Sequence, residues 1–170
     1  MSNTRSLGIT DIVLPCVDES RLTSQHDWHI LAARLQPAVA LCESLNVNLA
    51  LETDLCSADF AALLDIFGSP RVTVNYDVGN SASLGFDPTE EWRTYGSKVS
   101  SVHIKDRVLH GASVPLGSGS ARFEAFFRTA HGMGFRGLFV LQAARDGNEI
   151  EAVRRYKGFV QRHTDLSYAG

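Results

Sequence analysis

Four ionisable side chains fall within five positions at the end of the apolar-alternating run 99–104. They are His103, Lys105, Asp106 and Arg107. A glycine loop at 115–119 and a helix-like pattern that opens at Phe123 follow this cluster. Parallel α/β enzymes build their active sites from a strand that ends in polar residues, followed by a loop and a helix. We therefore expect chemistry at this strand end.

Three other apolar runs also end in a polar residue, and these residues are Glu52, Asp77 and Gln142. If the runs are parallel strands of a barrel, all four side chains point toward one mouth. Two carboxylates, an imidazole and an amide oxygen form a credible octahedral-type site for Mn²⁺, Mg²⁺, Co²⁺ or Zn²⁺. Each residue taken alone is more often a cap, a salt-bridge partner or a hydrogen-bonded histidine. Because four strand ends agree, we predict a metal site formed by these three residues and His103.

The elements that would position these side chains alternate regularly along the chain. Apolar runs indicate strands at 9–14, 47–52, 71–77, 99–104 and 137–142, with amphipathic helical patterns between them. Strands that alternate with helices and are nearly uniformly apolar predict a parallel sheet covered by helices. Dividing 170 residues by five units gives about 34 residues a unit, which matches a (β/α)₈ barrel of on the order of 250 residues.

The predicted fold is an α/β, TIM-type parallel (β/α) barrel that is incomplete, with about five βα units. It would form a single partial barrel domain over residues 1–170, with its core at about 8–165, because the sequence has no low-complexity run and no linker. An open doubly wound sheet is the alternative. Neither a GxGxxG motif after a strand nor a P-loop is present to support it.

Local signals indicate where several helices begin. Ser24, with Asp27 three positions later, predicts the cap of a helix. Ser57 predicts the cap of a second, short helix. Asp87 followed by Pro88 predicts an N-cap and a first helical residue.

The composition argues against several classes of partner. The chain is 44% hydrophobic and 21% charged with a formal net charge of −3, so it carries no electrostatic footprint for nucleic acid or a membrane surface. No apolar run approaches the roughly 18 residues of a membrane span, and the N-terminus lacks the apolar core of a signal peptide. Three cysteines without a CxxC pair argue against a disulfide framework. We therefore expect a cytoplasmic protein with no nucleic-acid and no membrane partner.

The chain also carries five characteristic stretches: Leu-Ala-Leu-Glu at 49–52, Asn-Tyr-Asp-Val-Gly-Asn at 75–80, Val-His-Ile-Lys-Asp at 102–106, Pro-Leu-Gly-Ser-Gly at 115–119 and Phe-Arg-Gly-Leu-Phe-Val-Leu-Gln at 135–142. In this order and spacing they resemble the xylose isomerase-like superfamily of sugar phosphate isomerases and epimerases. The resemblance implies that the five strands correspond to strands four to eight of the family barrel. Glu52, Asp77 and His103 then fall on three of the four metal-ligand positions of the family.

The chain departs from the family pattern at three points. Gln142 stands where the fourth ligand is typically glutamate. Asn80 stands where a substrate-binding histidine is often found. The first three βα units of the family barrel have no counterpart.

The family reaction is proton transfer next to a carbonyl through an enediolate, assisted by a divalent metal that stabilises the developing charge. Glu52 could move a proton on one face of a sugar or sugar phosphate, as an aldose–ketose isomerisation requires. Gln142 can ligate or hydrogen-bond, but an amide cannot abstract a proton near neutral pH, so we expect two-base epimerisation to be lost. The resemblance thus implies an isomerase/epimerase-like protein of carbohydrate metabolism. A catalytically inactive member that binds metal or sugar, or acts as a subunit, remains the alternative.

A third class is an abasic-site endonuclease of the same superfamily. It would need more histidine and aspartate ligands for three zinc ions, and a basic surface for DNA. The sequence has neither.

Lys105 and Arg107 are candidates for holding a substrate phosphate or hydroxyl, with Asp106 orienting them, and the resemblance adds Asn80 to the substrate-binding residues. The alternative for Lys105 and Asp106 is a solvated pair at a strand end. The glycine loop 115–119 either lies over the mouth or only turns the chain.

Five units cannot close a ring, so the strands at 9–14 and 137–142 would have unpaired edges. We expect these edges to be covered in a homo-oligomer or by a complementing chain. The other possibility is that the sequence begins inside a longer enzyme.

Overall fold

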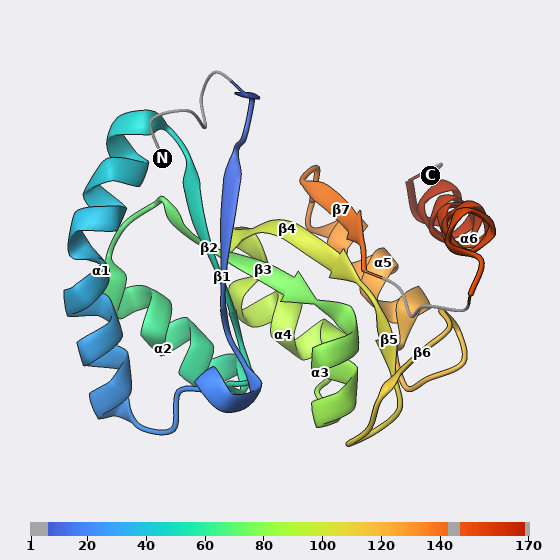
Figure 1. The fold of residues 1–170 in the computed structure, drawn as a ribbon, viewed down its shortest axis with the longest axis horizontal. Helices are drawn as coiled ribbons and strands as arrows, with labels where there is room; N and C mark the ends of the chain where they lie inside the picture. Colours follow the sequence, from blue (N-terminus) through green and yellow to red (C-terminus); the bar gives the residue numbers. More distant parts are fainter. Residues whose placement is uncertain (1–6, 143–146, 169–170) are drawn as a thin grey trace.

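The computed structural model of the chain describes residues 7–142 and 147–168, with side chains to residue 165, and a five-stranded sheet forms its centre (Figure 1). The strands lie in the order of the chain: β1 (Asp11–Cys16), β2 (Asn48–Thr53), β3 (Val72–Asp77), β4 (Val99–Ile104) and β7 (Leu138–Leu141). All neighbouring strands pair in parallel. A doubly wound sheet reverses its strand order at a switch point, and this sheet has no reversal. The strand order is therefore that of a barrel, and the parallel α/β architecture predicted from the sequence is confirmed.

Long helices form a layer on the outer face of the sheet (Figure 1). They are α1 (Gln25–Leu45), α2 (Ser57–Phe67), α4 (Pro88–Tyr95), α5 (Phe123–Gly132) and α6 (Glu149–Tyr168). Each of these helices packs against the next one along the chain. None of the helices that the structure describes is both long and apolar enough to cross a membrane.

The hydrophobic core lies between the sheet and this helix layer. Strand side chains that point outward, such as Leu51, Val74 and Ile104, are fully buried. They meet the aromatic side chains of α4 and α5, among which Trp92 and Phe126 are 5.6 Å apart between ring centroids. Burial of this apolar surface is the main favourable term that holds helices and sheet together.

The inner face of the sheet carries the polar side chains. Successive side chains of a strand point to opposite faces. Tyr76 therefore points into the core between sheet and helices, while Asp77 points to the inner face of the sheet. The register places Asp77 of β3 opposite His103 of β4, and His103 opposite Val140 of β7. The alternation in these strands thus separates core residues from candidate site residues.

Two of the three predicted helix starts are confirmed. Ser24 and Asp27 form a reciprocal capping box at the start of α1, and Asp87 accepts a hydrogen bond from the backbone N–H of Thr89 with Pro88 as the first helical residue. The cap predicted at Ser57 is wrong. The N-cap of α2 is Cys56, and the hydroxyl of Ser57 instead donates to Glu90 of α4 at 3.0 Å.

The first strand also differs from its predicted bounds, 9–14, because β1 extends through Pro15 to Cys16. Proline lacks the N–H that a central strand needs, but an edge strand tolerates it. β1 is an edge strand in the described sheet. The proline therefore does not end it.

Several short elements were not predicted. The helix α3 (Val78–Leu84) follows β3 directly, and an antiparallel pair, β5 (Asp106–Arg107) and β6 (Ser113–Val114), follows β4. Single 3₁₀ turns lie at η2 (Asp18–Ser20) and η3 (Gly96–Lys98). Of these, α3, β5 and η2 stand at the carboxyl ends of strands, where the candidate site lies.

Candidate metal and substrate site

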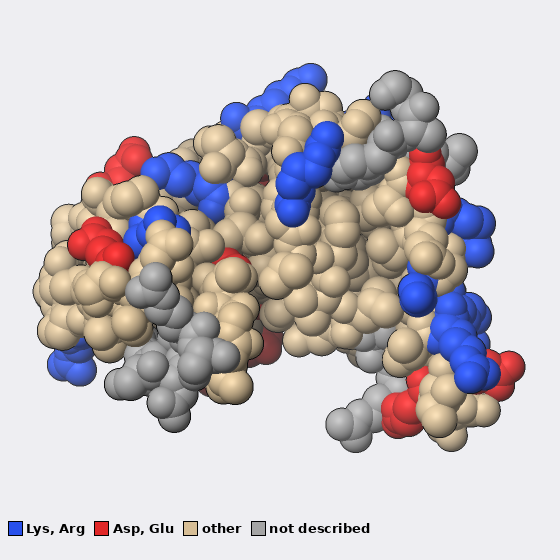
Figure 2. Space-filling model, turned by 90° about the horizontal axis from the view of Figure 1, so that it is seen from above, with Lys and Arg blue, Asp and Glu red and all other residues tan. Residues whose placement is uncertain are grey.

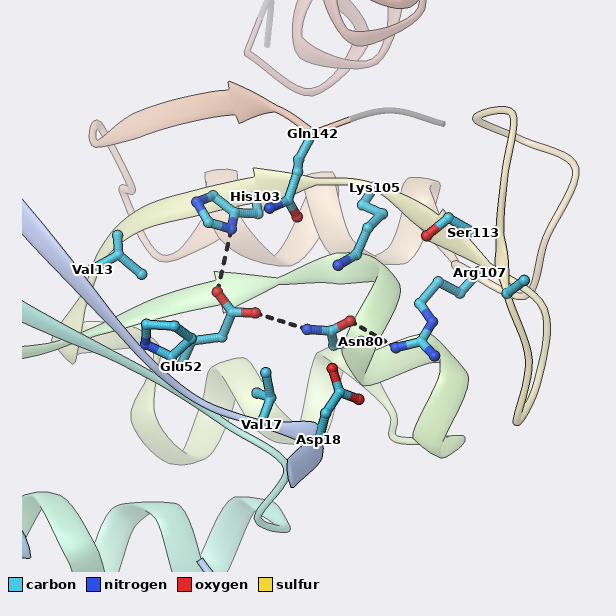
Figure 3. Close-up of a pocket in the computed structure, with 12 residues that line it drawn as sticks. Val13, Val17, Asp18, Glu52, Asn80, His103, Lys105, Arg107, Ser113 and Gln142 are labelled. Atoms are coloured by element: carbon cyan, nitrogen blue, oxygen red, sulfur yellow. Dashed lines mark hydrogen bonds and ion pairs between the residues drawn. The ribbon is translucent and has the colours of Figure 1, made fainter. Parts of the chain in front are cut away.

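Three side chains from neighbouring strands converge at the carboxyl end of the sheet, and Figure 3 shows two of them, Glu52 and His103. Asp77 ends β3, whereas Glu52 and His103 each lie one residue before the end of their strands, β2 and β4. One ligand atom from each lies within 4.8 Å of the others. His103 Nδ1 is 3.3 Å from Glu52 Oε2 and 3.8 Å from Asp77 Oδ2.

The donor set fits a divalent cation. Imidazole nitrogen and carboxylate oxygen are the ligands that Mn²⁺, Co²⁺ and Zn²⁺ take in proteins. Two of the converging atoms, Asp77 Oδ2 and His103 Nδ1, are buried and make no hydrogen bond of normal geometry with the described residues. Their nearest charged groups are Lys105 Nζ, 2.8 Å from Asp77 Oδ2, and Glu52 Oε2, 3.3 Å from His103 Nδ1. A cation held between these two atoms would compete with those ion pairs.

The charges of this cluster shift the pKa values of its members. The facing carboxylates, Asp77 first and then Glu52, raise the pKa of His103 to about 9. Burial alone would raise the pKa of Asp77, but the facing imidazole and the Lys105 ammonium hold it below its usual value. The Lys105 ammonium nitrogen is 2.8 Å from Asp77 Oδ2. Without a metal, the cluster is therefore an ion-pair network of two cations and two carboxylates.

A shell of amide and hydroxyl groups fixes the Glu52 carboxylate. Asn75 donates to Oε2 at 2.8 Å and Asn80 donates to Oε1 at 2.7 Å. Ser101 in turn donates to the amide oxygen of Asn75 at 2.7 Å. Such partners orient a metal ligand and are as much part of a site as the ligand itself.

Asn80 connects this carboxylate to the cationic end of the site. Its amide oxygen accepts from Arg107 at 2.9 Å (Figure 3). Its backbone N–H donates to Asp77 at 2.8 Å. Arg107 also donates through Nε to the backbone oxygen of Gly111 at 2.9 Å. The arginine is thus held in one orientation beside the two carboxylates.

A cavity of about 660 Å³ opens above the cluster. Its walls include most of the side chains named from the sequence: Glu52, Asn80, His103, Lys105, Arg107 and Gln142. Asp77 lies behind this wall and is 4% exposed. The exposed Gln142 reaches into the same cavity from the end of β7, close to His103 and Lys105 (Figure 3). Its backbone N–H donates to the carbonyl of Ile104 at 3.0 Å.

Two expectations about the neighbours of His103 are wrong. Asp106 orients neither Lys105 nor Arg107, because it is fully buried and accepts backbone N–H bonds from Gly117, Gly119 and Ala121. Lys105 is not paired with Asp106 either, since its ion pair is with Asp77. Adjacent residues of an extended segment point to opposite sides, which separates the two side chains.

The glycine loop does not line the cavity. The segment before it does so through Ala112 and Ser113. Sequence reasoning also missed Asp18, Asn75 and Ser101 as site residues. Asp18 could have been found, because it is a polar residue that follows the strand β1. Asn75 and Ser101 lie within strands, where this strand-end signal does not apply.

Comparison with known proteins identifies the family of the chain. The sequence profile of the family described as xylose isomerase-like TIM barrel matches residues 1–162. The chain belongs to this family. The barrel-type fold and the resemblance carried by the strand-end motifs are thereby confirmed.

Relatives within the xylose isomerase-like family are longer than this chain. A "Putative L-ribulose-5-phosphate 3-epimerase" of Haemophilus influenzae is 29% identical over an alignment of 141 positions that covers 73% of this chain and 49% of that protein. An inosose dehydratase of Clostridium perfringens is 21% identical over an alignment of 178 positions that covers 89% of this chain and 60% of that protein. The chain thus spans less than two thirds of either relative.

Solved structures of the family share the fold. A xylose isomerase domain protein from Planctomyces limnophilus superposes with a TM-score of 0.86 at 18% identity, over 99% of this chain and 64% of that one. The IOLI protein, solved with a zinc atom, gives a TM-score of 0.81 at 16% identity, over 98% of this chain and 66% of that one. An L-ribulose 3-epimerase gives 0.78 at 17% identity, over 99% and 65%. The five βα units therefore correspond to part of a TIM barrel.

Proposed function

We propose that the chain binds a divalent metal through Glu52, Asp77 and His103, with the amide oxygen of Gln142 as fourth ligand, and acts on a sugar or sugar phosphate. The observation that carries the proposal is the convergence of two carboxylates and an imidazole from three neighbouring strands, with one ligand atom of each within 4.8 Å of the others. Zinc in the IOLI structure and the sugar epimerases among the relatives support it.

The reaction we propose is proton transfer at a carbon next to a carbonyl. A bound divalent cation would supply positive charge where the substrate oxygen becomes negative. Glu52 would accept the proton and return it, with its carboxylate oriented by Asn75 and Asn80. Lys105 and Arg107 stand on the cavity wall and would hold the substrate, together with Asn80.

Position 142 limits what this site can do. Two-face epimerisation needs a second base, and an amide does not accept a proton near neutral pH. The chain would therefore exchange or move a proton on one face only, as an aldose–ketose isomerase does. A protein that binds metal and sugar without turnover is the alternative, and Gln142 is the observation that favours it.

Proton exchange in deuterated water tests the proposal. The chain is mixed with Mn²⁺ and a panel of ketose and aldose phosphates, and deuterium entry next to the carbonyl is followed by NMR. We expect exchange with at least one substrate and a loss of about 100-fold or more in Glu52→Gln. The variant Gln142→Glu should add epimerisation. No exchange by the wild type, despite sugar and metal binding, would support the non-catalytic alternative.

We also propose that a partner covers the open side of the sheet, either a second copy or a complementing chain. No described strand pairs with the outer edges of β1 and β7. Leu138 and Val140 of β7 are 56% and 43% exposed, and their register with Ser101 and His103 places them on the inner face. Seen from above, the molecule is hollowed between its two ends (Figure 2).

A further inference from the structure

A buried carboxylate lies behind the candidate site and takes no part in the chemistry proposed above. Glu91 of α4 is 4% exposed and forms no ion pair with the residues that the structure describes. It accepts hydroxyl hydrogen bonds from Tyr76 at 2.8 Å, from Tyr95 at 2.9 Å and from Ser81. Burial raises the pKa of Glu91. An acidic group without a nearby cation is costly to bury, and the three hydroxyl donors offset part of this cost. We call Glu91 and its three donors the hub.

The hub contacts the sequence neighbours of three site residues. Tyr76 lies between Asn75 and Asp77 on β3, and its side chain points to the opposite face from theirs. Ser81 directly follows Asn80 on α3. Glu91 therefore binds side chains of the two segments that carry these site residues, in β3 and α3. It does so on the side that faces away from the cavity.

Contacts with its surroundings, rather than its own length, hold the helix α3, which is buried except for its last residue. It is seven residues long, and isolated helices of that length are not stable in water. At its start Asp77 caps the backbone N–H of Asn80. Gly79 lies so close to Lys105, the residue after β4, that an added Cβ would be 2.9 Å from its Cγ. On the side of the α4 helix, the hydroxyl of Ser81 binds Glu91.

We propose that Glu91 is a positioning residue that fixes α3 through Ser81 and thereby sets the Asn80 amide on Glu52. The Asn80 amide joins Glu52 to Arg107. A shift of α3 would therefore move two groups at once: the carboxylate proposed to bind metal and the arginine proposed to hold substrate. This inference rests on the proposed metal site.

Two variants of matched chemistry test the role of the hub. Ser81→Ala and Tyr95→Phe each remove one hydroxyl donor from the Glu91 carboxylate. Only Ser81 belongs to α3, whereas Tyr95 lies on α4 together with Glu91. A purely structural hub would respond to both losses alike.

The first readout needs no metal. In the metal-free chain, the side-chain NH₂ signals of Asn80 in ¹⁵N NMR should shift and exchange faster with water in Ser81→Ala, and should stay as in the wild type in Tyr95→Phe. The second readout is Mn²⁺ affinity by calorimetry. We expect about a tenfold loss in Ser81→Ala, the lower end of the effect of removing an outer-shell partner, and less than about a twofold loss in Tyr95→Phe.

Unchanged Asn80 signals in Ser81→Ala, or equal shifts in both variants, would overturn the positioning role. The variant Ser81→Thr, which keeps the hydroxyl, should restore the wild-type signals. If the wild type binds no Mn²⁺, the metal proposal fails, while the Asn80 signals still decide whether Glu91 positions α3.

Discussion

At the scale of single residues, the site is a balanced set of four charges. Glu52 and Asp77 face His103 and Lys105 at 2.8–3.8 Å. A divalent cation placed among these ligands would displace the proton of His103 and compete with the Lys105 ammonium. In the metal-free chain, the site can therefore be tested by removing or titrating its two cations, His103 and Lys105.

The first prediction concerns pH. The pKa of His103 is raised from 6.5 to about 9 in the folded, metal-free chain. A raised pKa means that protonation stabilises the folded state, fully below about pH 6.5, and that this stabilisation is lost as the pH rises through 9. We expect the free energy of unfolding, measured by urea titration with a chelator present, to fall by about 1–3 kcal/mol over this window. His103→Gln should remove this part of the pH dependence, and an unchanged dependence in that variant would refute the assignment.

The second prediction concerns Lys105. In Lys105→Met the buried Asp77 loses the nearer of its two cations and keeps His103, so the metal-free chain should lose about 1–3 kcal/mol of stability. Its affinity for Mn²⁺ should rise, because no ammonium competes for Asp77. Lys98→Met, at an exposed lysine of η3, is the control and should change neither quantity. A fall in Mn²⁺ affinity in Lys105→Met would contradict the competition.

At the scale of elements, the strand ends were predictable and the segments that follow them were not. Parallel strands bring their carboxyl ends to one edge whatever the loops do, so Glu52, Asp77 and His103 could be named together from the sequence. The helix α3 is rich in serine and glycine, which favour turns and caps over helix interiors. Tertiary contacts through Gly79 and Ser81 hold it instead, and these leave no periodic pattern.

Asp106 shows the same limit in the glycine loop. Its sequence neighbours suggested a role in the site, yet its carboxylate organises the loop from Gly117 to Ala121. A Cβ at Gly119 would lie 2.3 Å from Asp106 Oδ1, so the loop approaches this carboxylate closely. The spacing of residues along the chain does not reveal which backbone segment approaches a buried acceptor, because that approach depends on the three-dimensional fold.

The third prediction follows from this loop. In Asp106→Asn an amide NH₂ replaces one acceptor oxygen, which leaves at least one backbone N–H without a partner. The expected cost is about 1–3 kcal/mol of stability, with faster hydrogen exchange at Gly117 and Gly119 or at Ala121. Asp87→Asn is the matched control, since asparagine caps a helix as well as aspartate does. Equal stability of the two variants would contradict the role given to Asp106.

At the scale of the whole molecule, the number of βα units could be counted from hydrophobic periodicity, because alternation of strands and helices is a local property. The partner proposed to cover the open side could not be identified from the sequence, since its residues would lie outside this chain. Leu138 on the inner face is the clearest mark of that side, at 56% exposure. An exposed strand edge is a template for pairing.

The fourth prediction is therefore an association. Light scattering should show the wild type as larger than a monomer, or purification should recover it with a second polypeptide. Leu138→Lys should weaken the association, while Ile30→Lys, at an exposed residue of the outer helix α1, should not. A wild type that is a monodisperse monomer with no bound polypeptide would refute the covered edge.

The central claim is that Glu52, Asp77 and His103 hold a divalent metal, and calorimetric titration of Mn²⁺ tests it most directly. The wild type should bind one ion, and His103→Ala should lose about 10-fold to 100-fold or more in affinity. His29→Ala, at an exposed histidine of α1, should bind as the wild type does. Negligible binding by the wild type, or equal affinities of the wild type and His103→Ala, would contradict the account.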